Sequence, residues 1–276
     1  MQAYDQQTLR TTTELAAIAT VAYSGPDGMP RMISVTPLLL DGTPAVALTY
    51  ARSDLAQEIL ASPQAAFTYA DSRLAYVGWS PLSVTAKMEV IPDPEGRLFR
   101  DKLLDQQLRK FPPDRQLIGS LLLQRENWWC MPRWIVRVVE AGEPRAVARR
   151  TGADHGILAR KAGQAIAADT VRVEDWDADP IVVEPLSDES LAYGTFPAAL
   201  FFHDFAIPDM DPRTSFLITG WLDKGRLSVT QRTGSRELGK RPGLIARWRA
   251  QRDLERRCKA GLKTRLRQRS TGAVRR

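Results

Sequence analysis

Cysteine and histidine are scarce in this chain, whose 276 residues include two of each. Cys130 and Cys258 stand far apart in no paired spacing, so we expect free thiols rather than a disulfide framework or a zinc cluster. His155 and His203 show neither metal-ligand nor catalytic-triad spacing, which disfavours hydrolase chemistry. We expect His203 to be a hydrogen-bonded histidine at a strand end, with axial ligation of haem as the alternative.

Long hydrophobic runs are also missing. The sequence has no stretch of about twenty apolar residues and no charged-apolar-small leader, so we expect neither membrane insertion nor export, and a cytoplasmic protein. Its 43% apolar content is enough for one large core or two modest ones. Two units are the more natural division.

Short alternating apolar segments dominate the first part of the chain. Residues 18–23, 32–40 and 45–50 are typical of three β-strands, separated by turn residues at 24–28 and 41–42. Consecutive strands joined by such short turns predict an antiparallel sheet.

A short amphipathic helix is expected directly after the third strand. Ser53 is placed to cap it, Asp54 suits the positive end of its dipole, and Pro63 ends it. Extended patterns then follow at 66–70 and, with the most regular alternation of the chain, at 82–90. The order predicts a mainly β fold with helices, of the α+β class.

The order and spacing of these segments resemble a known family, over residues 11–141. The segments that carry the resemblance are residues 18–21, 27–30, 48–53, 61–66 and 134–139. The chain is similar to the flavin-binding split barrels related to pyridoxamine phosphate oxidase. This resemblance implies an antiparallel split β-barrel over residues 1–141, an FMN or deazaflavin cofactor, a small-molecule substrate and a homodimer.

The resemblance also implies a cofactor site. In such barrels the cofactor lies across the second and third strands, with its phosphate at the start of the helix. The residues implied in this site are Arg31, Ser34, Thr36, Thr49, Arg52, Ser53 and Lys87. The chain departs from the family after Ser53, where Asp54 and Leu55 replace two basic residues. We expect Arg31, Arg52 and Lys87 to supply the missing charge, the alternative being that they are ordinary solvated charges.

Three tryptophans fall within residues 128–134, after an expected helix at 95–110. Trp128 or Trp129 could cover a flat heteroaromatic ring while Arg133 meets a phosphate or a ring carbonyl. In the related families this segment borders the cofactor. The alternative is that the aromatic rings fill the barrel mouth or a dimer interface.

Residues 142–240 are typical of a β-rich accessory region. Residues 232–238 resemble the strand-to-serine passage at 40–55 with one residue inserted, which would make this region a second half-barrel. Such a chain could build within one polypeptide a pocket that relatives form between two subunits. The alternative is a coincidental hairpin.

The C-terminal segment, residues 241–276, is strongly basic. It contains thirteen Lys or Arg residues against two acidic ones, a net charge of +11, so the first 240 residues carry −4 of the chain's +7. An amphipathic helix with an Arg-rich end is expected. It could dock on the acidic body, or it could bind nucleic acid or an acidic membrane surface.

Two functions follow from these observations. The first is a flavin- or deazaflavin-dependent oxidoreductase that passes a hydride or electrons to a small organic substrate. The second is a non-catalytic binding protein of the same fold, holding haem or another planar ligand, with its basic tail on nucleic acid or an acidic partner. The sequence indicates no catalytic acid or base and no metal site.

Overall fold

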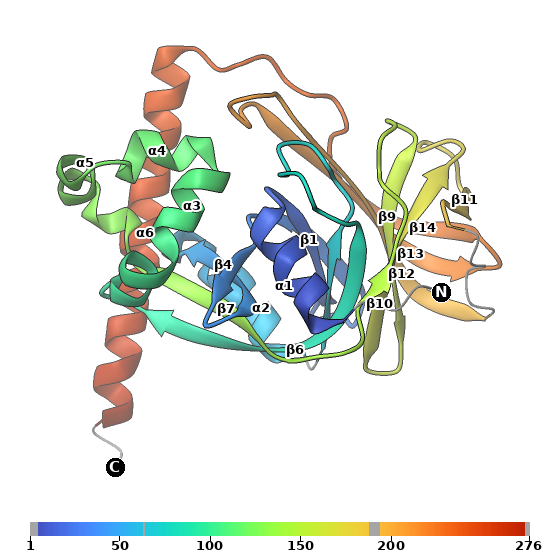
Figure 1. Cartoon of the computed structure of the whole chain (residues 1–276), viewed down its shortest axis with the longest axis horizontal. Helices are drawn as coiled ribbons and strands as arrows, with labels where there is room; N and C mark the ends of the chain where they lie inside the picture. The colour runs from blue at the N-terminus through green and yellow to red at the C-terminus, as the bar shows by residue number, and fades with distance from the viewer. Residues whose placement is uncertain (1–4, 63, 188–193, 274–276) are drawn as a thin grey trace.

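A computed structural model of the whole chain describes residues 5–62, 64–187 and 194–273 (Figure 1). It confirms the predicted α+β class: two antiparallel β units lie beside each other, and a long C-terminal helix runs along one side.

The first unit is an eight-stranded sheet in the order β2-β1-β5-β6-β7-β4-β3, with β8 paired to β6. The strands are β1 (Ala19–Ser24), β2 (Pro30–Val35), β3 (Leu38–Leu40), β4 (Thr43–Thr49), β5 (Ala65–Tyr69), β6 (Leu82–Asp93), β7 (Arg133–Ala141) and β8 (Arg145–Ala146). The helix α2 (Ser53–Ala61) follows β4, as the strand-helix-strand pattern predicts.

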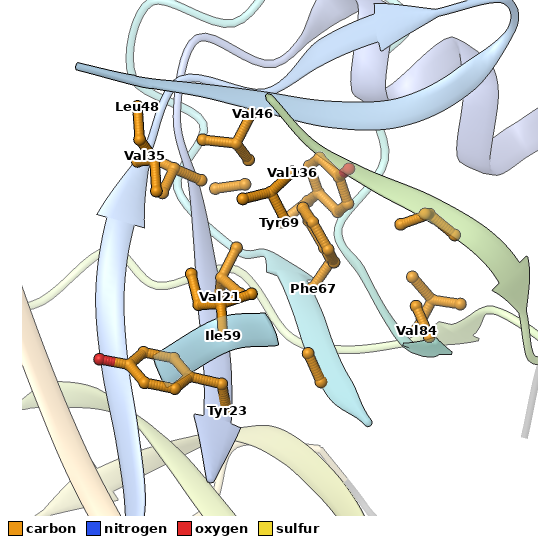
Figure 2. Packing of buried hydrophobic residues seen from close by; sticks show 14 of the residues in the cluster. Val21, Tyr23, Val35, Val46, Leu48, Ile59, Phe67, Tyr69, Val84 and Val136 are labelled. Atoms are coloured by element: carbon orange, nitrogen blue, oxygen red, sulfur yellow. The ribbon is translucent and has the colours of Figure 1, made fainter. Parts of the chain in front are cut away.

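Alternate residues of these strands fill the first core. Val21, Phe67, Tyr69, Val84 and Val136 point into one cluster (Figure 2). Side chains of a strand alternate between its two faces, so the apolar alternation read from the sequence gives this sheet its buried side.

The prediction of one strand over residues 32–40 is wrong. β2 ends at Val35 and pairs with β1, whereas β3 begins at Leu38 and pairs with β4. Pro37 has no N–H to continue a ladder, so the chain breaks there. The two pieces consequently lie at opposite ends of the strand order.

The second unit is a closed barrel in the order β10-β11-β14-β13-β12-β9. Its strands are β9 (His155–Ala162), β10 (Ala165–Val173), β11 (Ile181–Pro185), β12 (Thr195–Phe205), β13 (Arg213–Asp223) and β14 (Arg226–Gly234). The passage at residues 40–55 leads into the helix α2, whereas residues 235–243 contain no helix. The region forms a closed six-stranded barrel.

The two units pack directly against each other. β2 contacts β9, β12 and β13, and β10 contacts β5 and β6. Met32 of the first unit and Ile157 and Phe201 of the second lie in one buried apolar cluster. The contact therefore resembles the interior of a domain.

Most helices gather at the end of the molecule opposite the second barrel (Figure 1). They are η2 (Phe99–Leu103, a π-helical turn), α3 (Leu104–Lys110), α4 (Pro112–Ile118), α5 (Leu121–Glu126), η3 (Trp128–Cys130) and α6 (Leu244–Ala273). The helix α1 (Gln6–Leu15) packs on β3 and β4, and the 3-10 turn η1 (Tyr50–Arg52) joins β4 to α2. No helix within the described ranges is long and apolar enough to cross a membrane.

The basic helix α6 is docked on the body. Cys258 is buried, and Leu254 and Leu262 pack against the cores of the first unit. Gly261 lies so close to η1 that a Cβ there would stand 2.2 Å from the carbonyl oxygen of Tyr50. The expectation of intramolecular docking therefore holds for this helix.

Candidate functional site

A cavity of about 380 Å³ opens where the two β units and α6 meet. The ends of β2 and β4 form one wall, β12 and β13 a second, and α6 a third. Apolar side chains cover much of it: Ile18, Val35, Val46, Leu48, Phe111, Phe205, Met210 and Leu254. A volume of this size lies within the roughly 300–1,000 Å³ of small-molecule sites.

Five of the sequence-predicted site residues line this cavity. They are Ser34, Thr36, Thr49, Arg52 and Arg133. Their segments are far apart in sequence, and the folding of β2, β4 and β7 against one another brings them together.

The other four lie elsewhere. Arg31 pairs with Glu58 at 3.3 Å, and Lys87 pairs with Glu140 at 2.6 Å on the surface. Trp129 is buried in the core beneath α6. These three are absent from the cavity wall, and so is Ser53.

The prediction that Ser53 caps α2 is wrong. Arg52 holds the cap position and no side chain caps the helix. The Ser53 hydroxyl donates to the carbonyl of Tyr50 at 2.8 Å and accepts from Trp134 Nε1 at 3.0 Å. The 3-10 turn carries the serine one residue into the helix, and Gly261 of α6 covers it. This hydroxyl is therefore engaged within the protein.

Arginine supplies the positive charge of the cavity. Arg52, Arg133 and Arg213 all line it, and within the described residues none of them has a carboxylate within ion-pair distance. Arg257 of α6 also lines it and pairs with Asp253 at 2.8 Å. The charges of Arg257 and Arg213 each interact with that of Arg52, and this mutual repulsion favours an anion among the three.

The pKa values of two of these arginines reflect this crowding. Desolvation by surrounding protein atoms, followed by the charge of Arg257, lowers the pKa of Arg52. Desolvation and the charge of Arg52 lower the pKa of Arg213 in the same way. Both side chains are solvent-exposed and line the cavity.

Arg133 is the most buried of the four, with 1% of its surface exposed. Its guanidinium lies 4.2 Å from the centre of the Phe99 ring and donates to the carbonyl of Pro132 at 3.2 Å. Burying a cation without a counter-charge is unfavourable, so a bound anion would stabilise this arrangement.

Asp114 is an acidic residue of the cavity wall. It accepts a hydrogen bond from Gln107 Nε2 at 2.9 Å. Burial raises its pKa, although the charges of Arg133 and Arg213 act in the opposite direction. Asp114 therefore adds a carboxyl group to the cavity wall beside Arg133 and Arg213.

His203 lies at the cavity wall within a buried charge network. Arg150 approaches both ring nitrogens at 3.2 Å and pairs with Asp71 at 2.9 Å, while Arg73 joins Asp71 to Asp204. Burial and then the charge of Arg150 lower the pKa of His203 well below its ordinary value, so the ring is neutral. With both nitrogens beside Arg150, His203 is poorly disposed to ligate a metal. The expected hydrogen-bonded role fits this geometry.

Sequence reasoning missed Arg213, Arg257 and the network around Arg150. Arg213 opens a strand beside a proline and Arg257 is one of thirteen basic residues in its segment, so neither stands out locally. Only the packing of the second barrel and α6 against β4 identifies them.

No family model matches the chain, and no curated protein matches it. Among solved structures, a heme binding protein from Mycobacterium smegmatis is 15% identical, with 94% of this chain and 99% of that one aligned at a TM-score of 0.33. A conserved hypothetical protein from Mycobacterium tuberculosis is 16% identical over 51% of this chain and 84% of that one, with a TM-score of 0.36. A Clostridium acetobutylicum protein of the pyridoxinephosphate oxidase family is 10% identical over 60% and 95%, with a TM-score of 0.31. Likeness at this level assigns no ligand and no activity.

Proposed function

We propose that the cavity binds a phosphorylated planar cofactor, FMN or a deazaflavin coenzyme, and that the protein is an oxidoreductase acting on a small organic substrate. One observation carries this proposal: Arg52, Arg133 and Arg213 line one cavity without an ion-pair partner among the described residues. Such a cluster suits a phosphate, which arginine binds by charge-assisted hydrogen bonds.

The remaining wall suits the rest of such a cofactor. Ser34, Thr36 and Thr49 offer hydroxyls for the polar atoms of a ring or a ribityl chain, and Val46 and Leu48 offer an apolar surface for the ring. A bound flavin or deazaflavin would supply the hydride chemistry itself. The chain's own residues would bind and orient the cofactor and exclude water.

The phosphate would lie away from the position that the resemblance implies. Ser53 is engaged by Tyr50 and Trp134, so we assign the phosphate to Arg52 and Arg213 instead. Because Arg213 belongs to the second unit, this assignment predicts a site that the first unit alone cannot form.

Non-catalytic binding of a planar ligand would use the same cavity. For haem, the neutral ring of His203 would have to leave Arg150 before it could ligate iron. Haem is therefore a weaker candidate ligand for this cavity than a phosphorylated cofactor.

Isothermal titration with FMN and with riboflavin tests the assignment, because riboflavin lacks only the phosphate. Arg52→Ala and Arg213→Ala should each weaken FMN binding about 10- to 150-fold, the equivalent of about 1.5–3 kcal/mol for a hydrogen bond to a charged group. Riboflavin should bind weakly and equally to all variants. Arg226→Ala, an exposed arginine of β14, is the matched control.

Equal FMN affinity in both arginine variants and the control would refute the phosphate site. FMN binding that is retained without turnover by any hydride donor would favour the binding-protein alternative.

A further inference from the structure

Exposed apolar side chains concentrate on the helices at the end of the molecule opposite the second barrel. Of the 14 large hydrophobic residues exposed within the described chain, seven lie on α5, η3 and α6. We call these seven the helical edge: Leu121, Leu122, Trp128, Leu244, Ile245, Trp248 and Leu266. Leu121 is 83% exposed and Leu244 is 82% exposed, so these are solvated side chains rather than partly covered core residues.

The three elements of the helical edge adjoin one another. Arg247 of α6 donates to Gln116 of α4 at 2.7 Å, and Lys259 lies 5.5 Å from the centre of the Trp128 ring. α5 contacts α4, and η3 contacts both α5 and α6. Figure 1 shows α4, α5 and α6 at this end of the molecule. Exposed apolar side chains thus lie near both ends of α6 and on α5 and η3.

Basic side chains accompany this apolar surface. A groove of about 420 Å³ is lined only by Trp128, Leu262 and Leu266 together with Lys259, Lys263 and Arg267. Arg249 and Arg256 are further exposed cations of α6. The helical edge therefore combines exposed Leu, Ile and Trp residues with a segment whose net charge is +11 by sequence.

We propose that the helical edge binds the surface of an anionic lipid bilayer, with α6 lying on the headgroups. A helix that carries Lys and Arg beside Trp and Leu can insert the apolar side chains at the headgroup boundary while its cations meet lipid phosphates. Exposed apolar patches rimmed by charge mark interaction surfaces of this kind.

Charge argues against a second copy of the chain as the occupant. A two-fold symmetric dimer through this edge would place one basic α6 opposite another, and like charges facing each other are unfavourable. Nucleic acid would satisfy the cations, yet it has no apolar surface to cover Leu121, Leu122, Leu244 and Ile245. An anionic bilayer meets both requirements.

Co-sedimentation of the full chain with vesicles tests this proposal. The vesicles are phosphatidylglycerol and phosphatidylcholine in equal parts, with phosphatidylcholine alone for comparison. We expect binding to the anionic vesicles, at least tenfold weaker binding to the neutral ones, and a fall as salt is raised.

Two variants separate the contributions of charge and apolar surface. Arg249→Gln with Lys263→Gln should weaken binding to anionic vesicles about 25-fold, at about fivefold for each cation. Trp248→Ser should weaken it about tenfold through lost burial of apolar surface. The matched controls are Arg226→Gln and Trp221→Ser, exposed residues of the second barrel that should leave binding unchanged.

Several outcomes would overturn the proposal. These are no sedimentation with anionic vesicles, equal binding to neutral vesicles, and equal binding of the variants and their controls. A dimer in light scattering that the Trp248→Ser change dissociates would assign the edge to self-association. Binding of duplex DNA that the cation variant abolishes and Trp248→Ser leaves intact, without vesicle binding, would assign it to nucleic acid.

Discussion

Replacing Gly261 by alanine tests how closely α6 packs against the first unit. A Cβ at this position would lie 2.2 Å from the carbonyl oxygen of Tyr50 and 2.9 Å from the hydroxyl of Ser53. The first neighbour is backbone, held in η1 between β4 and α2, and cannot rotate away. The helix or the turn must therefore move, and the buried Cys258 one turn earlier would move with it.

Two opposing effects set the magnitude of this change. Alanine is favoured over glycine within a helix by about 1 kcal/mol, which would stabilise an unconstrained α6. Overpacking a tight contact costs about 1–3 kcal/mol and more where the neighbour is rigid. Because the contact is with backbone, we expect a net loss of about 1–2 kcal/mol in the free energy of unfolding.

Urea unfolding monitored by tryptophan fluorescence measures this loss. Ala260→Gly, at the exposed position just before, calibrates the helix propensity because it makes the reverse exchange without the contact. If Gly261→Ala is as stable as the original chain or more so, α6 does not pack on η1 as described. Limited proteolysis should also cut α6 faster in the Gly261→Ala variant.

Four further substitutions probe contacts near the site and elsewhere in the structure. Burial alone would raise the pKa of Asp71, but the hydrogen bond from Arg73 and the surrounding charges lower this pKa from 3.8 to about 2. The stability that Asp71 contributes is therefore complete above about pH 5 and is lost as the pH falls toward 2. The urea midpoint of the Asp71→Asn variant should change less over that range than the midpoint of the original chain. Trp134→Phe removes the hydrogen bond to Ser53 while keeping a ring beside Tyr50, and should cost about 1 kcal/mol in urea unfolding. Asp169 is 9% exposed and pairs with Arg145 and Arg160, so Asp169→Asn should lower the free energy of unfolding by about 2–3 kcal/mol. Breaking the exposed Lys87–Glu140 pair by Lys87→Gln should cost less than about 0.5 kcal/mol. Similar losses in the two variants would contradict the burial of Asp169.

The sequence predicted the parts of the fold that depend on local pattern. Alternation located β1, β4, β5 and β6, since a half-buried strand needs one apolar and one polar face. It failed at residues 32–40, where apolar residues continue through Pro37 and conceal the break between β2 and β3. A run of apolar residues shows burial, and the hydrogen-bonding partner on each side decides where a strand ends.

The candidate site was predictable on the segments of the first unit to which the resemblance points. Thr49 and Arg52 follow from the strand-to-helix passage, and both line the cavity. Arg213 and Arg257 come from the second barrel and α6, and no local pattern distinguishes an arginine that will face a cavity from one that will face solvent. Ser53 is the opposite case. Its position in the sequence suggests a phosphate contact, but in the structure its hydroxyl is bound by Trp134 and covered by α6.

Both β units and α6 of one chain contribute side chains to the cavity. Occupancy of the site is therefore expected to follow ligand concentration alone and to stay constant as the protein is diluted. A pocket assembled from two subunits behaves differently, because it disappears once the concentration falls below the dissociation constant of the dimer. We expect a cavity built within one chain to keep its ligand on dilution, and the occupancy measured over a dilution series tests this expectation.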